Sequence, residues 1–329
     1  MNRNLELEDK FYANTNFAFS YSSLNKLLFS PSLFYKDYIL WDREVRADKH
    51  LVEGKLVHCL VFEPENLTSK FNIVPGKSPS DNIRKVLKDM SFHTDAKTLA
   101  ACDDETILES LKNLNLFQSL KADESRIAKV RTEDNEPYWK FLNNSNVDVV
   151  DQDTLSKCTD KANVIKENKD VMSLFENKST DFDLDPVEIF AEQYLTCKLN
   201  DKPFGLHGYI DFYKIDSEKK EVTICDLKTT AKGIAKFADT VDYYNYWLQA
   251  SIYIKLLIEN LTEEQQDYNI IFKFAVIDNY NQVYVFDVTD NTLANWGVAF
   301  NAVLNQAEYH YKEKNFSLPY EFLAETVKL

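Results

Sequence analysis

Apolar and polar positions divide the chain into a helical first part and a mixed second part. Up to about residue 180, the apolar residues recur mainly at the three- and four-residue spacing of amphipathic helices. This pattern predicts helical segments over 20–41, 49–63 and much of 79–180, with a short strand at 70–75. Pro31 is expected to divide the first segment into two helices, because proline breaks a helix interior.

The pattern changes near residue 187. Short runs rich in Val, Ile, Phe, Tyr and Thr, separated by turn-forming residues, predict strands at 187–199, 205–215, 221–229, 269–277 and 281–288. Helical spacing returns at 242–260 and 290–314. The order β-β-β-α-β-β-α predicts an α/β or α+β core in which helices flank a mixed central sheet.

The domain organisation follows from these elements. We expect a single domain over 1–329, in which 20–65 is the helical N-terminal part of the core. A helical, acidic insertion is expected over about 79–180, and the sheet-and-helix core over about 187–315. Length and composition agree with a globular protein, because 44% of the 329 residues are hydrophobic and 28% are charged.

The formal net charge is −15, and residues 101–200 alone contribute −9. This charge argues against a protein that coats nucleic acid through a broadly basic surface. It leaves room for an enzyme with a local basic cleft.

Several other classes are excluded by scarce residue types. The chain has six glycines and neither a GxxxxGK[ST] nor a GxGxxG motif, so no nucleotide cofactor is expected. Five widely spaced cysteines without a CxxC pair argue against a zinc ribbon or an iron–sulfur cluster, and favour a reducing cytoplasm. We expect neither a signal peptide nor a membrane span, because no long apolar run is present.

The residues that suggest chemistry lie between 205 and 230. Asp211 follows apolar strand residues, and Asp226 and Lys228 are two positions apart on the next predicted strand, so they project to the same side. A hairpin would bring Asp211 beside them. Two carboxylates and a lysine suit a magnesium site for phosphodiester hydrolysis, in which the lysine positions or helps to deprotonate water, or neutralises developing charge.

The alternative is an ordinary hairpin with alternating charges, because a D-x-K tripeptide is common. The apolar residues that alternate with the pair argue against this alternative. They predict a strand that buries one face and leaves Asp226 and Lys228 on the other.

Three motifs in this part of the chain resemble a known family. G-x-x-D at 208–211, I-C-D-L-K-T-T at 224–230 and Y-x-x-Q-A-x-x-Y at 246–253 resemble the PD-(D/E)xK nuclease superfamily. Within it, the chain is most similar to the RecE-type phage and prophage exonucleases and the RecB-type nuclease domain. The resemblance implies a restriction-endonuclease-like core, in which Gln249 and Tyr253 support the catalytic Lys228 and the DNA. The proline–aspartate of the family label is not literal here, because Gly208-Tyr209-Ile210-Asp211 stands instead, a change that is common in the superfamily.

Two N-terminal segments extend the resemblance. Residues 53–63 resemble the family's G-x-x-x-H helix, which implies that His58 is a metal ligand, although a lone histidine in an apolar helix is more often a core residue. Residues 22–34 resemble the family's opening helix. Ser22 and Ser23 would there contact DNA phosphates, with plain N-capping as the alternative role.

The resemblance also implies the remaining ligands. Asp211 and Asp226 would bind Mg²⁺ together with the histidine, with Mn²⁺ as a substitute and the backbone carbonyl of Leu227 as a further ligand. Glu192 lies on the preceding strand and is either a second-shell or second-metal ligand or a surface residue.

Two lysines after the site, Lys232 and Lys236, are either phosphate contacts or solvated helix ends. No cysteine follows Cys225, which places the chain with relatives that lack an iron–sulfur cluster.

The function implied is a metal-dependent exonuclease that resects double-stranded DNA ends in phage-type recombination or repair. Its expected partners are duplex DNA ends, a single-strand annealing or recombination protein, and further copies of itself in an oligomer. The expected location is the cytoplasm, that of a bacterial host if a phage encodes the chain. The alternatives are a non-catalytic DNA-binding or virion protein on the same fold, and an endonuclease or single-strand nuclease.

Overall fold

The computed structural model describes residues 3–43, 48–144, 147–175 and 187–327. Its chain forms two compact units. The first unit contains residues 1–46 and 164–329, and the second contains 47–163. The last five residues of the predicted helical stretch, 176–180, lie outside the described residues.

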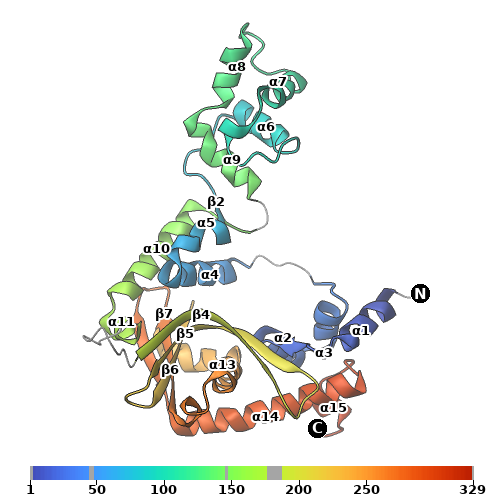
Figure 1. Cartoon of the computed structure of the whole chain (residues 1–329), viewed down its shortest axis with the longest axis vertical. Helices are drawn as coiled ribbons and strands as arrows, with labels where there is room; N and C mark the ends of the chain where they lie inside the picture. The colour runs from blue at the N-terminus through green and yellow to red at the C-terminus, as the bar shows by residue number, and fades with distance from the viewer. Residues whose placement is uncertain (1–2, 44–47, 145–146, 176–186, 328–329) are drawn as a thin grey trace. The chain divides into compact units, whose positions relative to one another are not determined.

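A mixed six-stranded sheet forms the centre of the first unit (Figure 1). Its strands are β1 (Ala18–Phe19), β4 (Val187–Lys198), β5 (Gly205–Asp216), β6 (Glu221–Thr229), β7 (Asn269–Ile277) and β8 (Val283–Val288). The strand order is β1-β5-β6-β7-β8, and β4 also pairs with β5. The β1/β5 and β6/β7 pairs are parallel and the others antiparallel. The five predicted strands of this part are confirmed, whereas the two-residue β1 was not predicted.

Helices surround this sheet. They are α1 (Arg3–Ala13), α2 (Tyr21–Phe29), α3 (Pro31–Phe34), α11 (Lys169–Phe175), α12 (Phe237–Tyr243), α13 (Tyr246–Asn260), α14 (Asp290–Glu313) and α15 (Tyr320–Leu323), with a π-helical turn at Tyr35–Ile39 and 3₁₀ turns at Ile234–Lys236 and Gln265–Asp267. The predicted division at Pro31 is confirmed. Pro31 occupies the first turn of α3, where its missing N–H costs nothing, and the Ser30 hydroxyl accepts a hydrogen bond from the Leu33 N–H.

The single helix predicted over 242–260 is wrong in its first part, because α12 ends at Tyr243 and α13 begins at Tyr246. Asn245 between them is left-handed, with φ 55°, a conformation that asparagine tolerates better than most residues. Its side-chain amide donates to the Asn25 Oδ1 atom of α2 at 2.8 Å. The break therefore holds the start of α13 against α2.

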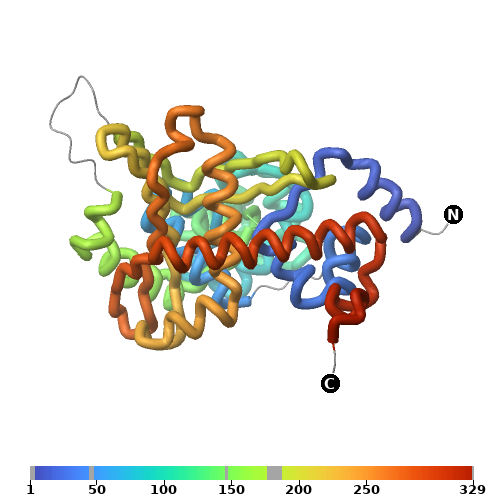
Figure 2. The backbone as a smooth tube through the Cα atoms, turned by 90° about the horizontal axis from the view of Figure 1, so that it is seen from below, coloured from blue at the N-terminus to red at the C-terminus, as the bar shows by residue number. Residues whose placement is uncertain are grey.

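The main core lies between the sheet and helices α13 and α14. Helix α13 contacts β4 and β5 as well as α14, and Figures 1 and 2 show α14 crossing the strands on the side of α13. Large apolar side chains fill this layer, among them Leu248, Ile252, Leu256, Phe272, Phe274 and Phe300. At Gly208 a Cβ would lie 3.3 Å from Leu256 Cδ1 and 3.5 Å from Tyr253 Cε1, so glycine permits the close approach of α13 to β5.

The second unit is mainly helical. It contains α4 (Lys49–Phe62), α5 (Leu67–Lys70), α6 (Asp81–Met90), α7 (Asp104–Asn113), α8 (Asp123–Val130), α9 (Glu136–Asn143) and most of α10 (Gln152–Glu167), with 3₁₀ turns at Pro64–Asn66, Leu99–Ala101 and Glu133–Asn135. Trp139 is fully buried in the core that α6–α9 share. The predicted strand at 70–75 is confirmed as β2 (Phe71–Ile73), which pairs with an unpredicted β3 (Asp148–Val150).

Across the described ranges, no helix combines the length and the apolar character that crossing a bilayer would require.

Candidate active site

The site lies where β5 and β6 separate. Their pairing begins at Asp216↔Glu221 and ends at Phe212↔Cys225, whereas the last four residues of β6 remain paired with β7. Asp211 is the first β5 residue past this separation. Its Oδ2 atom accepts a hydrogen bond from the Leu227 N–H at 2.9 Å, which ties the two strands together where their ladder has stopped.

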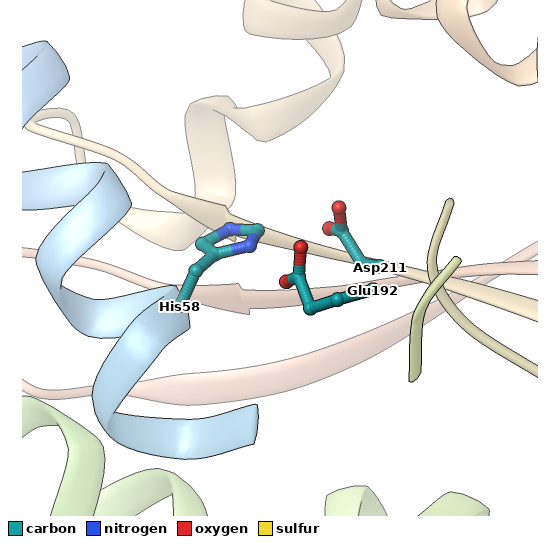
Figure 3. Close-up of side chains that lie close together, drawn as sticks. All are labelled: His58, Glu192 and Asp211. Atoms are coloured by element: carbon teal, nitrogen blue, oxygen red, sulfur yellow. The ribbon is translucent and has the colours of Figure 1, made fainter. Parts of the chain in front are cut away.

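Glu192 lies beside Asp211 on the other side of the hairpin. The register pairs Ala191 with Phe212 and Gln193 with Ile210, which places Glu192 opposite Asp211. Their carboxylates offer oxygen atoms within 4.8 Å of one another, and Figure 3 shows the two groups side by side.

The backbone of Glu192 is unusual for a strand residue. It is left-handed, with φ 49°, and the regular pairing on either side omits it. A non-glycine residue in this region costs free energy, and such residues cluster at functional sites. The distortion also changes which side of β4 faces the core, because Phe190 packs there before it and Leu195 after it. The sequence identifies Glu192 as a candidate, but nothing in it predicts the left-handed backbone of this residue.

Asp226 and Lys228 project together, as the two-residue spacing predicts. The Lys228 Nζ atom lies 2.5 Å from Asp226 Oδ2. The pattern predicts one buried face with the charged pair on the other, but the face that carries the pair is buried as well: Asp226 is completely buried and only 12% of the Lys228 side chain is exposed. The reason is that β6 is a central strand between β5 and β7, and such strands are buried on both faces.

The charge state of Lys228 follows from these contacts. Burial acts to lower its pKa, but the carboxylates of Asp226 and Asp211 outweigh burial and hold the pKa above its ordinary value. Lys228 is therefore an ammonium ion at neutral pH. It serves as a fixed positive charge within an otherwise acidic site.

Helix α13 supplies the remaining contacts of Lys228. Gln249 accepts a hydrogen bond from Lys228 Nζ at 2.9 Å, and its own Nε2 donates to the Tyr253 hydroxyl at 2.7 Å. The predicted shared face of Gln249 and Tyr253 is confirmed. Burial raises the pKa of Tyr253, and the nearby Asp211 raises it further, so the phenol stays neutral.

Tyr246 is a contact that the sequence analysis did not assign. Its ring centroid lies 4.6 Å from Lys228 Nζ, within the range of a cation–π interaction. The signal was present, because Tyr246 precedes Gln249 by three residues and so shares its side of the helix.

The remaining candidates belong to other elements. His58, the third side chain labelled in Figure 3, belongs to α4 of the second unit, where it is half-buried with its ring edge-on to Phe62. Ser22 is exposed in the first turn of α2, and the Ser23 hydroxyl takes part in a capping box with Ser20.

The two lysines that follow the site are both exposed. Lys232 lies over the Tyr243 ring at 5.4 Å, and Lys236 is 3.7 Å from Asp239.

The donor set suits a hard divalent cation. Glu192 and Asp211 offer neighbouring carboxylate oxygens, the ligands that Mg²⁺ and Mn²⁺ prefer. Asp226 lies on the adjoining strand β6, and Lys228 offsets its negative charge. The backbone of Leu227 also faces Asp211. Its N–H points toward Asp211, and the N–H and C=O of a strand residue face the same neighbour.

Comparison with known proteins gives little further information. No protein-family model matches the chain, and no curated protein matches its sequence. A crystal structure from Eubacterium rectale, named "Putative exonuclease", is similar with a TM-score of 0.46 and 11% identity over 96% of this chain and 90% of that one. A likeness this distant establishes neither the activity nor the family, so the chemistry rests on the site itself.

Proposed function

We propose that the chain is a metal-dependent deoxyribonuclease of the PD-(D/E)xK type that resects the ends of double-stranded DNA. One observation supports this most strongly. The ion-paired and hydrogen-bonded series Asp226–Lys228–Gln249–Tyr253 lies where β5 and β6 separate, beside the carboxylates of Glu192 and Asp211. A buried ion pair with a side-chain support is a costly arrangement that ordinary sheet packing does not need.

In this proposal Asp211, Asp226 and the Leu227 carbonyl hold the metal ion, and Glu192 completes the acidic set. Bound Mg²⁺ would polarise the scissile phosphate and lower the pKa of a water molecule. His58 is assigned as a further ligand by the G-x-x-x-H motif alone. In this proposal the nuclease supplies single-stranded DNA to an annealing protein in recombination or repair. That biological role rests on the same family resemblance.

Lys228 stabilises the negative charge that develops on the phosphate oxygens. Asp226 and Gln249 fix the position of its ammonium group, and Tyr253 fixes the orientation of Gln249. A charge that is already in place needs no reorganisation during the reaction, which is the condition for effective electrostatic catalysis.

The decisive experiment measures cleavage of end-labelled linear duplex DNA with Mg²⁺ and with EDTA. Lys228→Met is expected to lower cleavage about 10²-fold or more, since it removes the positive charge but keeps most of the length of the side chain. Because it also leaves a buried carboxylate unpaired, the double variant Asp226→Asn/Lys228→Met is tested beside it.

Lys273→Met is the matched control. Lys273 also belongs to a strand of this sheet and pairs with an aspartate, Asp287, but it lies outside the site. The Lys273→Met variant should cleave the linear duplex as fast as the unmodified protein does. Equal cleavage by the Lys228 variants and the control, or undiminished cleavage in EDTA, would refute the proposed mechanism.

The substrate class is tested with covalently closed circular DNA. An exonuclease degrades the linear duplex and leaves the circle intact, whereas an endonuclease cuts both. A protein that binds DNA without any Mg²⁺- or Mn²⁺-dependent product would be the non-catalytic alternative.

A further inference from the structure

Two exposed tyrosines lie next to the carboxylates. Tyr194 of β4 and Tyr209 of β5 are directly opposite in the register, and their ring centroids are 5.0 Å apart. The tyrosines are 52% and 59% exposed. We propose that this pair is a stacking platform for an unpaired nucleobase of the strand being cut.

The position of the pair relative to the site follows from the strand register. Glu192 and Asp211 are each two residues from one of the tyrosines, about 7 Å along the hairpin. A base held on the rings would therefore belong to a nucleotide close to the phosphate at the carboxylates. The inference rests on the proposed function, and it adds that the strand is unpaired when it reaches the site.

The rings face away from the core. Leu195 and Gly208 form the neighbouring register pair, and that side of the hairpin faces α13, since a Cβ at Gly208 would contact Leu256 and Tyr253. Because side chains alternate along a strand, Tyr194 and Tyr209 point to the opposite side. The register therefore places both rings on the outer side of the hairpin. Neither ring is explained by a packing role in the core of the first unit.

The same side of the hairpin continues with residues that suit a nucleic-acid strand. His207 lies with its ring centroid 5.9 Å from that of Tyr194, and burial lowers its pKa, so it adds a third, uncharged ring. Lys198, four residues after Tyr194 on the same side of β4, is exposed at the end of the strand. Carboxylates, aromatic rings and a cation thus follow one another along the hairpin.

A nucleobase is the occupant that this order favours. Every base has a π-face, and stacking on an aromatic side chain contributes to binding whatever the sequence. Each tyrosine also has a hydroxyl group, which can stay hydrated while a base stacks on the ring. A nucleic-acid strand whose phosphate lies at Glu192 and Asp211 would also place a base within reach of the two rings.

The test is binding of fluorescein-labelled (dT)₁₂ by anisotropy in EDTA, so that cleavage plays no part. The double variant Tyr194→Ser/Tyr209→Ser is expected to bind at least about fivefold more weakly. Tyr194→Phe/Tyr209→Phe, which keeps both rings, should bind within about twofold of the unmodified protein. Lys198→Ala should weaken the salt dependence of binding. The negative slope of log affinity against log salt concentration should become less steep by about 0.7.

Tyr284→Ser is the matched control, because Tyr284 is 56% exposed and contacts the ring of Phe286 edge-on, but belongs to β8. Its affinity should not change. Melting temperatures identify any variant that fails to fold, and the phenylalanine pair keeps the test informative in that case. Unchanged (dT)₁₂ binding by the serine pair, or binding of blunt duplex with no binding of (dT)₁₂ by the unmodified protein, would overturn the platform. Metal-dependent cleavage would be unaffected by either result. Failure of the platform proposal is therefore distinguishable from failure of the proposed nuclease function.

Discussion

Glu192 shows most directly how one residue connects backbone conformation with chemistry. It is left-handed within a strand that is otherwise regular, and its carboxylate lies beside that of Asp211. Unfavourable backbone conformations persist where the surrounding structure enforces them. Here the β4–β5 hairpin holds the residue on both sides, so that a structural cost places a carboxylate at the site.

This interpretation predicts opposite effects of Glu192→Gly on stability and on metal binding. Glycine adopts the left-handed region without strain, so Glu192→Gly should be about 1 kcal/mol more stable to denaturant than Glu192→Ala. Both variants should bind Mn²⁺ more weakly than the unmodified protein. Chemical denaturation and calorimetric titration measure the two quantities.

Lys220 provides the control, because it is also left-handed, with φ 54°, but lies in the turn between β5 and β6. Lys220→Gly should be more stable to denaturant than Lys220→Ala by a similar amount, with no loss of Mn²⁺ affinity in either variant. A Glu192→Gly variant no more stable than Glu192→Ala would contradict the strain argument.

At the scale of elements, the site depends on how the hairpin and helices are held around the separated strands. A clamp at the far end of the hairpin contributes to this. Lys202, in the turn between β4 and β5, reaches Glu308 of α14 at 2.7 Å, and their side chains are only 10% and 18% exposed. This pair joins the hairpin to the long helix that packs against α13.

The clamp predicts a specific pH dependence. Hydrogen bonds from Lys202 and Lys312 lower the pKa of Glu308, so the stabilisation is present above the pKa of an unfolded glutamate and is lost as pH falls through the lowered folded value. Glu308→Gln should cost roughly 0.5–1 kcal/mol in the free energy of unfolding at pH 7.

The difference between Glu308→Gln and the unmodified protein should shrink as the pH falls below about 4, as measured by denaturant titration at several pH values. A difference that stays constant down to pH 3 would show that Glu308 stabilises by packing alone. Glu313→Gln, at the end of the same helix, is the surface control.

At the scale of the whole molecule, both units are acidic, and the unit that contains Glu192 and Asp211 carries most of the excess. The second unit has 20 acidic and 16 basic residues, so the first unit carries −11 of the total −15. A surface of this kind repels a nucleic-acid backbone, and productive binding must come from local contacts that are sensitive to salt. A bound divalent cation would reduce the local repulsion at the carboxylates.

Metal binding should therefore raise the thermal stability of the chain. At a Mn²⁺ concentration one hundred times the dissociation constant, the gain is about 2.7 kcal/mol, which corresponds to a rise of several degrees in melting temperature. Asp211→Asn should abolish the rise in a thermal melt monitored by circular dichroism. EDTA should reverse the rise in the unmodified protein. An equal rise in Asp211→Asn would place the metal elsewhere.

Much of the fold could be predicted from the sequence alone, because its determinants are local. Apolar periodicity gave the strands from β4 to β8 and the long α14, and the proline at residue 31 gave the break between α2 and α3. The two-residue spacing of Asp226 and Lys228 and the four-residue spacing of Gln249 and Tyr253 already determined which side chains project together.

The tertiary structure decided what depends on pairing between distant segments. The short β1 and β3 strands exist only through their parallel partners, and Asp226 is buried because β6 lies between two other strands. The separation of β5 from β6 and the left-handed Glu192 have no local signal, because both arise from how the hairpin meets the rest of the sheet. Local sequence thus supplied the chemical groups, and long-range packing fixed their burial, their charge and which of them meet.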